Sequence, residues 1–286
     1  MRTDRFQVAD GVDLAVDTWE PAVSGGPPFL LVHGLASNAR TWDGVAAALV
    51  ADGHRTFTVD LRGHGRSSKP EGPYDVPTVA DDLAALIERL GLGTDPPVVA
   101  GQSWGGNLAL ESAARHPDAT RGVVCVDGGW LELSRGFPDW EACRSALEPP
   151  RLAGRRREEI ESYIRSAHRD WPESGILGTL ANFEVRPDGT VAPWLTFDHH
   201  ITVLRGLWEH HPSRRYAEVP VPVLLVPADS GDPDWTERKH RDVEGAAEAI
   251  RNARIHWFAG DHDIHAQHPD ELAGVMHELT TDGFFG

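Results

Sequence analysis

The sequence predicts an α/β fold in which helices flank a mostly parallel, twisted sheet, with a helical cap inserted into it. In the first half of the chain, short apolar runs alternate with segments of helical periodicity. This alternation is typical of parallel sheets whose strands are buried on both faces. After Gly129 the alternation stops, and no convincing buried strand follows until residue 221. We therefore expect a core formed by residues 1–130 and 216–286 and a cap formed by residues 131–215.

The first half of the chain contains four apolar runs that are expected to be buried strands, at residues 29–32, 56–59, 97–100 and 123–126. A crossover helix is predicted at residues 78–90, because apolar residues recur there at helical spacing: Val79, Leu83, Leu86 and Leu90. Thr78 is expected to cap the start of this helix, and Gly91 follows its end.

The inserted segment is rich in arginine, proline and tryptophan. Residues 154–168 are charged on most faces, so the charge run at 155–159 is expected to be a solvated helix face and not a binding patch. Five of the ten tryptophans fall in or beside the insertion: Trp130, Trp140, Trp171, Trp194 and Trp208. A lid over a pocket is where large flat apolar side chains would contact an apolar substrate, and we expect some of these rings to do so.

The sheet pattern resumes with an apolar run at residues 221–226. A helix at 236–250 and a strand at 254–258 are predicted to follow it. The last predicted helix carries four apolar residues on one face: Leu272, Val275, Met276 and Leu279.

Charge and apolar content limit the partners of the protein. The chain has 286 residues and a formal net charge of −17, which argues against nucleic acid or an anionic membrane surface as a partner, because both are also negative. No stretch approaches the roughly 18 consecutive apolar residues of a membrane span, and the N-terminus has no apolar signal region, so we expect a cytoplasmic protein. Cys125 and Cys143 form neither a CxxC pair nor a disulfide framework and are expected to be structural thiols.

The segment Gly101-Gln102-Ser103-Trp104-Gly105 lies between a predicted strand and a helix. A sharp turn in this context lifts a serine hydroxyl clear of the sheet, where a base can remove its proton. A side chain at either glycine would collide across so tight a turn. Ser103 is therefore the predicted nucleophile of a serine hydrolase.

Four segments together resemble the α/β-hydrolase family, and the likeness extends over nearly the whole chain: residues 31–35, residues 60–67, the turn at Ser103, and residues 260–265 followed by Pro269. The resemblance implies the fold of that family, with an inserted cap. It also implies an oxyanion hole formed by the backbone N–H groups of Leu35 and Trp104. We expect the Trp104 ring to be a pocket wall, His33 and Trp130 to contact the substrate, and residues 60–67 to brace neighbouring loops.

The general base is expected near the C-terminus, because this family orders its triad as serine, acid and histidine. His262 follows the final predicted strand and precedes Pro269 by seven residues, as in the family pattern. His265 and His268 share that loop and are expected to be loop and helix-cap residues. Their spacing matches no common ligand set, so no metal is predicted.

The acid of the triad is left open between three aspartates. The family usually takes it from the turn after the seventh strand, where this chain offers Asp229 and Asp232 without the usual glycine-x-x-acid spacing. A minority of the family takes it from the end of the sixth strand, where Asp127 stands 24 residues after Ser103. Asp127 is the first choice, Asp232 the second and Asp229 the third. An aspartate at that strand end can also be purely structural, through hydrogen bonds to loop N–H groups.

These residues imply acyl transfer, with no cofactor: His262 takes the proton of Ser103, which attacks a carbonyl. The expected substrate is a small hydrophobic ester or lactone. The alternatives are a C–C bond hydrolase, a ligand sensor that turns over slowly, and a lyase in which His262 transfers the proton and Ser103 only orients the substrate. An aspartate at position 103 would instead have indicated epoxide or haloalkane chemistry.

Overall fold

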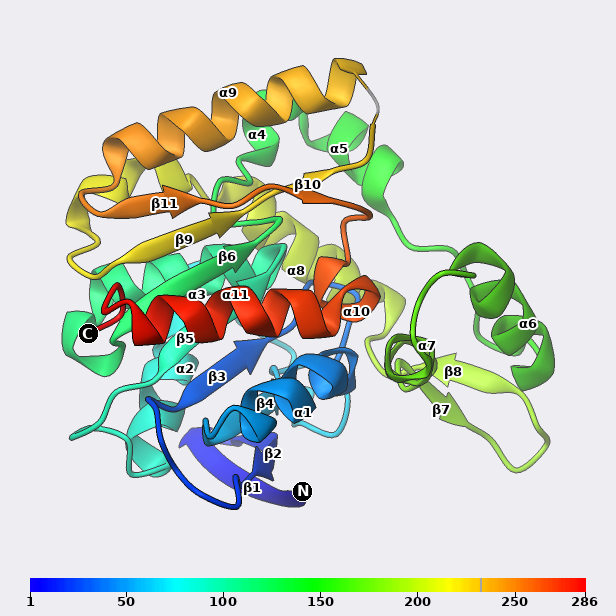
Figure 1. The fold of residues 1–286 in the computed structure, drawn as a ribbon. Helices are drawn as coiled ribbons and strands as arrows, with labels where there is room; N and C mark the ends of the chain where they lie inside the picture. The colour runs from blue at the N-terminus through cyan, green and yellow to red at the C-terminus, as the bar shows by residue number, and fades with distance from the viewer. Residues whose placement is uncertain (232) are drawn as a thin grey trace.

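Eight strands form one sheet in the order β1-β2-β4-β3-β5-β6-β9-β11, seen in Figure 1. The computed structural model describes residues 1–231 and 233–286, with the backbone alone described for 233–236. The strands are β1 (Arg2–Ala9), β2 (Val12–Trp19), β3 (Phe29–Val32), β4 (Thr56–Asp60), β5 (Val98–Gln102), β6 (Gly122–Val126), β9 (Val223–Val226) and β11 (Ala253–Ile255). The pairs β1·β2 and β2·β4 are antiparallel, and the pairs from β4 to β11 are parallel. The predicted fold class is confirmed.

Helices cover both faces of this sheet, and successive strand residues alternate between the two layers. On one face, Phe29 and Leu31 of β3 pack in a buried cluster with residues of α1 (Asp43–Ala51) and α11 (Pro269–Thr281). On the other face, Leu30 and Val32 pack with α2 (Val76–Arg89), α3 (Trp104–Arg115) and α9 (Pro233–Ala249). Strand β3 is apolar at every position because both of its faces are covered.

The crossover helix α2 begins two residues before its predicted start. Asp75 is its N-cap, and the Asp75 carboxylate accepts a hydrogen bond from the backbone N–H of Thr78 at 2.9 Å. The expectation that Thr78 caps the helix is therefore wrong. A carboxylate at Asp75 satisfies a free amide of the first turn, and Pro77 in that turn needs no acceptor.

Three elements near the C-terminus also differ from the prediction. Strand β9 begins at Val223 and not at residue 221, and α9 begins at Pro233 and not at residue 236. The predicted strand at 254–258 is divided, since β11 ends at Ile255 and β12 (Phe258–Ala259) pairs with β10 (Ala228–Asp229).

The hairpin of β1 and β2 was not predicted, because β1 is exposed or half-buried throughout and carries no apolar run.

The segment between β6 and β9 contains α4 (Leu133–Gly136), α5 (Trp140–Leu147), α6 (Arg157–Ala167), α7 (Glu173–Leu180) and α8 (Phe197–Glu209). It also contains a hairpin of β7 (Phe183–Val185) and β8 (Val191–Pro193), which was not predicted. In Figure 1, α6, α7 and this hairpin form a lobe beside the sheet. Two residues of α6 are buried, Ile160 and Ile164. The domain boundaries at 131 and 215 stay a prediction.

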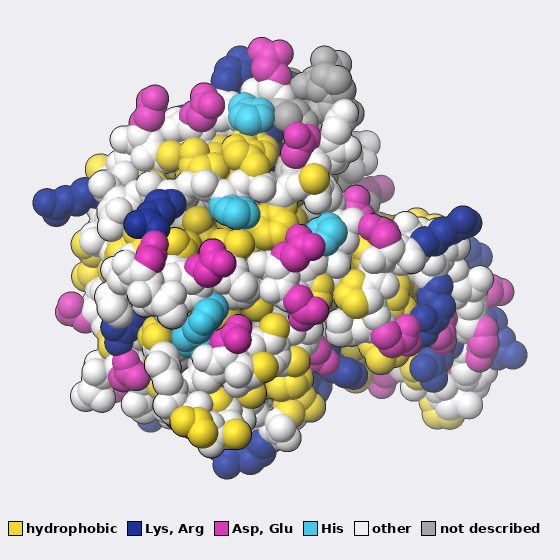
Figure 2. Space-filling view, in the orientation of Figure 1, with side chains coloured by type: hydrophobic (Ala, Val, Ile, Leu, Met, Phe, Trp, Pro, Cys, Tyr) yellow, Lys and Arg dark blue, Asp and Glu magenta, His cyan; other side chains and the backbone are white. Residues whose placement is uncertain are grey.

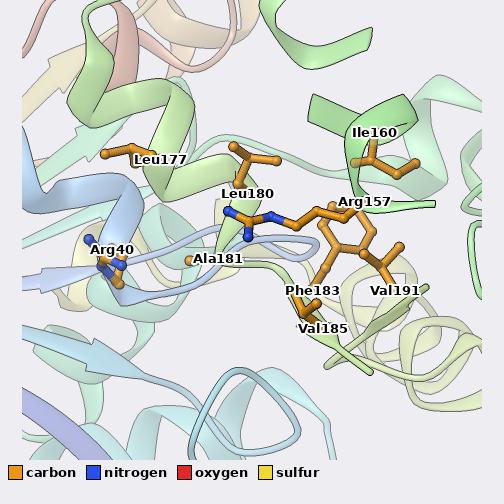
Figure 3. Close-up of a pocket in the computed structure, with 9 residues that line it drawn as sticks. All are labelled: Arg40, Arg157, Ile160, Leu177, Leu180, Ala181, Phe183, Val185 and Val191. Atoms are coloured by element: carbon orange, nitrogen blue, oxygen red, sulfur yellow. The ribbon is translucent and has the colours of Figure 1, made fainter. Parts of the chain in front are cut away.

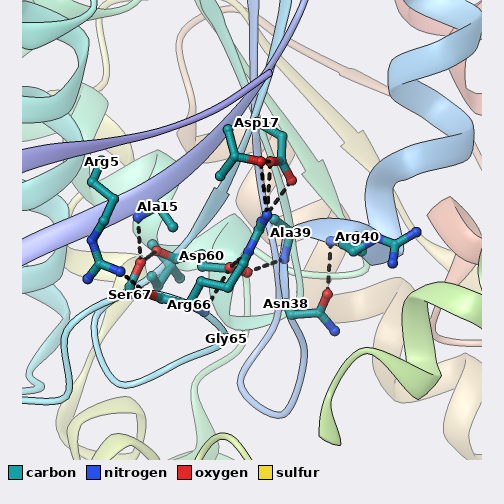
Figure 4. A network of polar contacts seen from close by, with 12 residues as sticks. Arg5, Ala15, Asp17, Asn38, Ala39, Arg40, Asp60, Gly65, Arg66 and Ser67 are labelled. Carbon is teal, nitrogen blue, oxygen red and sulfur yellow. Dashed lines mark hydrogen bonds and ion pairs between the residues drawn. The ribbon is translucent and has the colours of Figure 1, made fainter. Parts of the chain in front are cut away.

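A buried ion network fixes the loop after β4, as Figure 4 shows. The Asp60 carboxylate accepts hydrogen bonds from the Ala39 amide at 2.8 Å and from Arg66 Nε at 2.8 Å. Arg66 also makes two hydrogen bonds, of 2.9 and 2.7 Å, to the Asp17 carboxylate on β2. Residues 60–67 therefore brace the loop that precedes α1, as expected.

Acidic and basic side chains are intermixed on the face seen in Figure 2, and neither sign covers it alone. Within the described part of the chain, every helix is too short or too polar to cross a bilayer.

Replacing Arg62 with methionine should lower the free energy of unfolding by about 3–5 kcal/mol. Arg62 and Asp82 are each 3% exposed and form two hydrogen bonds, of 2.5 and 2.6 Å. Without Arg62, the Asp82 carboxylate stays buried and uncompensated. Urea denaturation measures the loss. The exposed Arg205–Glu209 pair is the control, and Arg205→Met should cost less than about 1 kcal/mol. Equal losses in the two variants would contradict the prediction.

Candidate active site

Ser103 stands at the turn between β5 and α3 with φ 54° and ψ −118°, a conformation that a non-glycine residue rarely adopts. The two flanking glycines make the turn possible. A Cβ on Gly101 would lie 2.0 Å from the Gly105 carbonyl oxygen, and one on Gly105 would lie 2.5 Å from the Val32 carbonyl oxygen. The collision across the turn predicted for Gly101 is confirmed, whereas a side chain at Gly105 would collide with the end of β3 and not across the turn. The turn presents the Ser103 side chain to a cavity.

His262 and Asp127 meet above the sheet although 135 residues separate them. His262 Nδ1 lies 2.6 Å from Asp127 Oδ2. Because an ionised carboxylate only accepts hydrogen bonds, Nδ1 carries the proton and Nε2 keeps its lone pair. Asp127 directly follows β6 with a positive φ of 42°, which turns the chain at the strand end. Of the three candidate acids, Asp127 is the one that the structure pairs with His262.

Asp229, another candidate acid, forms a hydrogen bond within its own loop. The Asp229 carboxylate accepts a hydrogen bond from the Gly231 amide at 2.9 Å. Asp232 lies outside the described residues.

Asp127 and His262 each shift the pKa of the other in the direction that favours the charged form. Burial would raise the pKa of Asp127, which is 5% exposed, but its contacts with His262 and with the Lys239 ammonium outweigh burial and lower that pKa. Desolvation would lower the pKa of His262, but the hydrogen bond and charge of Asp127, together with the charge of Asp263, outweigh it and raise that pKa. His262 is therefore a stronger base than a free imidazole, and Asp127 remains ionised near neutral pH.

Ser103 and His262 line the same cavity of about 350 Å³. Six of the fourteen residues that line it are leucines: Leu35, Leu131, Leu133, Leu147, Leu204 and Leu207. None of the described residues that line it is lysine or arginine. His200 also faces it, and burial lowers the pKa of His200 to about 4, so its imidazole is neutral at pH 7. Between the described side chains of Ser103 and His262 no hydrogen bond is present; the two groups share the cavity.

Two backbone amides are available beside Ser103. Trp104 is the first residue of α3, so its N–H has no acceptor within the helix. Among the described residues, the amide of Leu35 also has no hydrogen-bond acceptor. His64 Nε2 lies 2.6 Å from the Leu35 carbonyl oxygen, which holds this loop in place. An anionic oxygen in the cavity would find unpaired donors at these positions.

The structure contradicts two of the expected roles. His33 is fully buried, with Nε2 accepting a hydrogen bond from the Leu61 amide and Nδ1 donating to the Gly34 carbonyl, so it is structural and cannot contact substrate. The Trp104 ring is also fully buried and packs in the core beside His64, so it is not a pocket wall. Neither residue lines the cavity.

Leucines line the cavity of Ser103 where tryptophans were expected. None of the five tryptophans lines the cavity of Ser103. Trp130 is 5% exposed and borders a neighbouring cavity of about 450 Å³ that also touches His262. Trp171 packs on His168, and Trp140 lies 6.2 Å from Trp208 between ring centres.

Several residues of the site that were not predicted lie at helical spacing on α8 and α9. His200, Leu204 and Leu207 lie one above the other on α8, at spacings of four and three. Lys239 of α9 contacts Asp127 and stands on the same stripe as the buried Val243 and Ala246. A search for such stripes in the inserted segment and in α9 would have found both sets.

A third cavity, of about 230 Å³, lies between α6, α7 and the hairpin, as Figure 3 shows. Its wall is apolar apart from Arg40 and Arg157, and no serine, histidine or acidic side chain is among the described residues that line it. Within the described residues, no group of three or more His, Cys, Asp and Glu side chains is placed to hold a metal.

Comparison with known proteins identifies the family. Residues 29–275 match the description of the alpha/beta hydrolase family. A 2-(acetamidomethylene)succinate hydrolase of Mesorhizobium japonicum is 31% identical over 209 residues, which are 72% of this chain and 71% of that protein. The AB hydrolase superfamily protein YisY of Bacillus subtilis is 37% identical over 213 residues, 71% of this chain and 74% of that protein.

The fold agrees with these sequence matches. The crystal structure of E-2-(acetamidomethylene)succinate hydrolase aligns with a TM-score of 0.78 at 23% identity and covers 99% of both chains. The chain thus belongs to the alpha/beta hydrolase family and is a hydrolase.

Proposed function

We propose that the protein cleaves a carboxylic ester or lactone of a hydrophobic small molecule through an acyl-enzyme on Ser103. The observation that carries this proposal is the cavity itself: Ser103 and His262 face it, and six leucines and no cationic side chain line its described wall. A buried carboxylate without a partner costs several kcal/mol, so a neutral apolar substrate suits this wall.

In the proposed reaction, His262, Asp127 and two backbone amides act on Ser103 and the substrate. His262 Nε2 removes the proton of Ser103, and Oγ attacks the carbonyl carbon. The amides of Leu35 and Trp104 stabilise the oxyanion, while Asp127 stabilises the imidazolium. His262 then donates its proton to the leaving alkoxide, and it activates a water molecule that releases the acid. No metal or cofactor takes part in the proposed steps.

A second candidate follows from the relative in Mesorhizobium japonicum, which acts on a succinate derivative. The chain would then hydrolyse a small anionic substrate, at a bond other than an ester. Succinate derivatives carry carboxylates, which need cationic partners in a binding site, and the leucine-lined cavity offers none among its described residues.

Two p-nitrophenyl esters of equal length separate these candidates. The hexanoate ends in a methyl group, and the adipate monoester ends in a carboxylate. We expect kcat/KM to be at least about tenfold higher for the hexanoate, because the carboxylate must be desolvated in an apolar wall. A preference for the adipate, or no turnover of either ester and of a matched lactone, would reject the proposal.

A further inference from the structure

Lys239 is a buried cation beside the proposed catalytic pair. It lies on α9 and is 8% exposed, although lysine is rarely buried. Its Nζ donates to Asp127 Oδ1 at 2.8 Å, to Asp127 Oδ2 at 3.0 Å and to the Ala228 carbonyl oxygen at 2.7 Å. The chain contains 27 basic residues, of which two are lysines, Lys69 and Lys239.

These contacts fix the orientation of the Asp127 carboxylate. Oδ1 accepts hydrogen bonds from Lys239 and from the Ala228 amide, the latter at 3.0 Å. Oδ2 faces His262 at 2.6 Å. With Oδ1 held on the side of α9, the second oxygen is directed at the imidazole.

The ammonium also changes the charge that His262 experiences. Asp127 and Asp263 both favour the protonated imidazole, and the neighbouring His265 is buried and neutral. Lys239 acts against them, because a positive charge disfavours a second positive charge nearby. Without Lys239, two carboxylates would face His262 with their charges less compensated.

We propose that Lys239 is a positioning residue of the active site, which directs the Asp127 carboxylate at His262 and offsets its charge, so that the imidazole stays available as a base near neutral pH. Lys239 acts through Asp127, to which its ammonium donates two hydrogen bonds. The kinetic part of its test rests on the proposed function, whereas the titration of His262 does not.

The test is Lys239→Met, which keeps the length of the side chain and removes its charge. We expect the pKa of His262, measured by NMR on the substrate-free protein with ¹⁵N-labelled histidine, to rise by about one pH unit. In the pH profile of kcat/KM for the hexanoate, the apparent pKa on the acid side should rise by the same amount. At a pH below both pKa values, kcat/KM of the variant should be about tenfold lower than that of wild type, because a pKa one unit higher lowers the neutral fraction of His262 tenfold. The gap to wild type should close at high pH.

Lys69→Met is the matched control. Lys69 Nζ donates to the Gly65 and Ser67 carbonyl oxygens, and it contacts neither Asp127 nor His262. The same substitution there should leave the pKa of His262 unchanged. If Lys239→Met does not fold, Lys239→Gln, which keeps polar donors and removes the charge, should show the same upward shift.

An unchanged pKa of His262 in the folded Lys239 variant would overturn the proposal, whatever the rate. An upward shift in a protein that cleaves no ester would support the role of Lys239 and reject the proposed function. The two failures are therefore distinguishable.

Discussion

Replacing Ser103 with alanine should abolish ester turnover, lowering kcat for p-nitrophenyl hexanoate by roughly 10⁶-fold. The proposed mechanism forms a covalent bond at Oγ, and no described residue of the cavity wall other than Ser103 and Ser37 carries a hydroxyl. Ser37 already shares a hydrogen bond with Thr41 at 3.0 Å. Stopped-flow absorbance of p-nitrophenol measures turnover, and a second recording with a fluorophosphonate shows whether covalent modification of a nucleophile abolishes it.

The control for this variant is Ser112→Ala, on the same helix. Ser112 is buried in α3 and does not line the cavity, so its loss should leave kcat within about tenfold of wild type. A Ser103→Ala enzyme that retains a tenth of the rate would show that water attacks directly. It would then favour the lyase-like alternative, in which Ser103 only orients the substrate. A wild-type enzyme that acylates once and stops would instead support the slow ligand sensor.

Replacing Asp127 with asparagine should lower kcat by about 10⁴-fold. The hydrogen bonds around the carboxylate give the reason. Oδ1 accepts from the Ala228 amide and from Lys239, so the oxygen of an asparagine would occupy this position. Its NH₂ group would then face His262 Nδ1 and donate to it, which places the imidazole proton on Nε2. An Nε2 that carries a proton cannot accept the proton of Ser103.

Asp229→Asn and Asp232→Asn are the matched controls, since they test the other two candidate acids by the same substitution. Both should keep kcat within about tenfold of wild type, because Asp127 already fills the position beside His262. Circular dichroism checks that each variant is folded, which matters most for Asp127→Asn because it leaves the Lys239 ammonium buried without its carboxylate. A large loss in Asp232→Asn with a small one in Asp127→Asn would assign the acid to Asp232.

Local sequence predicted the nucleophile and the sheet well for a steric reason. A Cβ on Gly101 would collide with the Gly105 carbonyl oxygen in the same turn, so Gly101 could be interpreted without knowing the rest of the chain. A Cβ on Gly105 would collide with the end of β3, which the local sequence does not reveal. Buried strands such as β3 and β6 are apolar at every position, because both faces are covered, and this also appears directly in the sequence. Strand β1, which is exposed or half-buried throughout, gave no such pattern and was missed.

The local sequence could not show whether a given histidine or tryptophan side chain is buried in the core or faces the cavity. His33 and His262 each follow a strand of the sheet or its extension, yet one is fully buried between the Gly34 carbonyl and the Leu61 amide and the other pairs with Asp127. Some tryptophan rings of the inserted segment were expected to contact the substrate, but the apolar side chains that this segment contributes to the cavity wall are leucines. Composition identifies apolar segments and does not identify which of their faces meet.

The sequence by itself determined the α/β class, the position of Ser103 and the C-terminal histidine, because these depend on periodicity and on sterics between neighbouring residues. The tertiary structure alone decided which aspartate meets that histidine, that a lysine from α9 stands behind it, and which side chains enclose the cavity. These pairings join residues more than 100 positions apart. They arise only when β6, α9 and the loop after β12 are brought together by packing on the sheet.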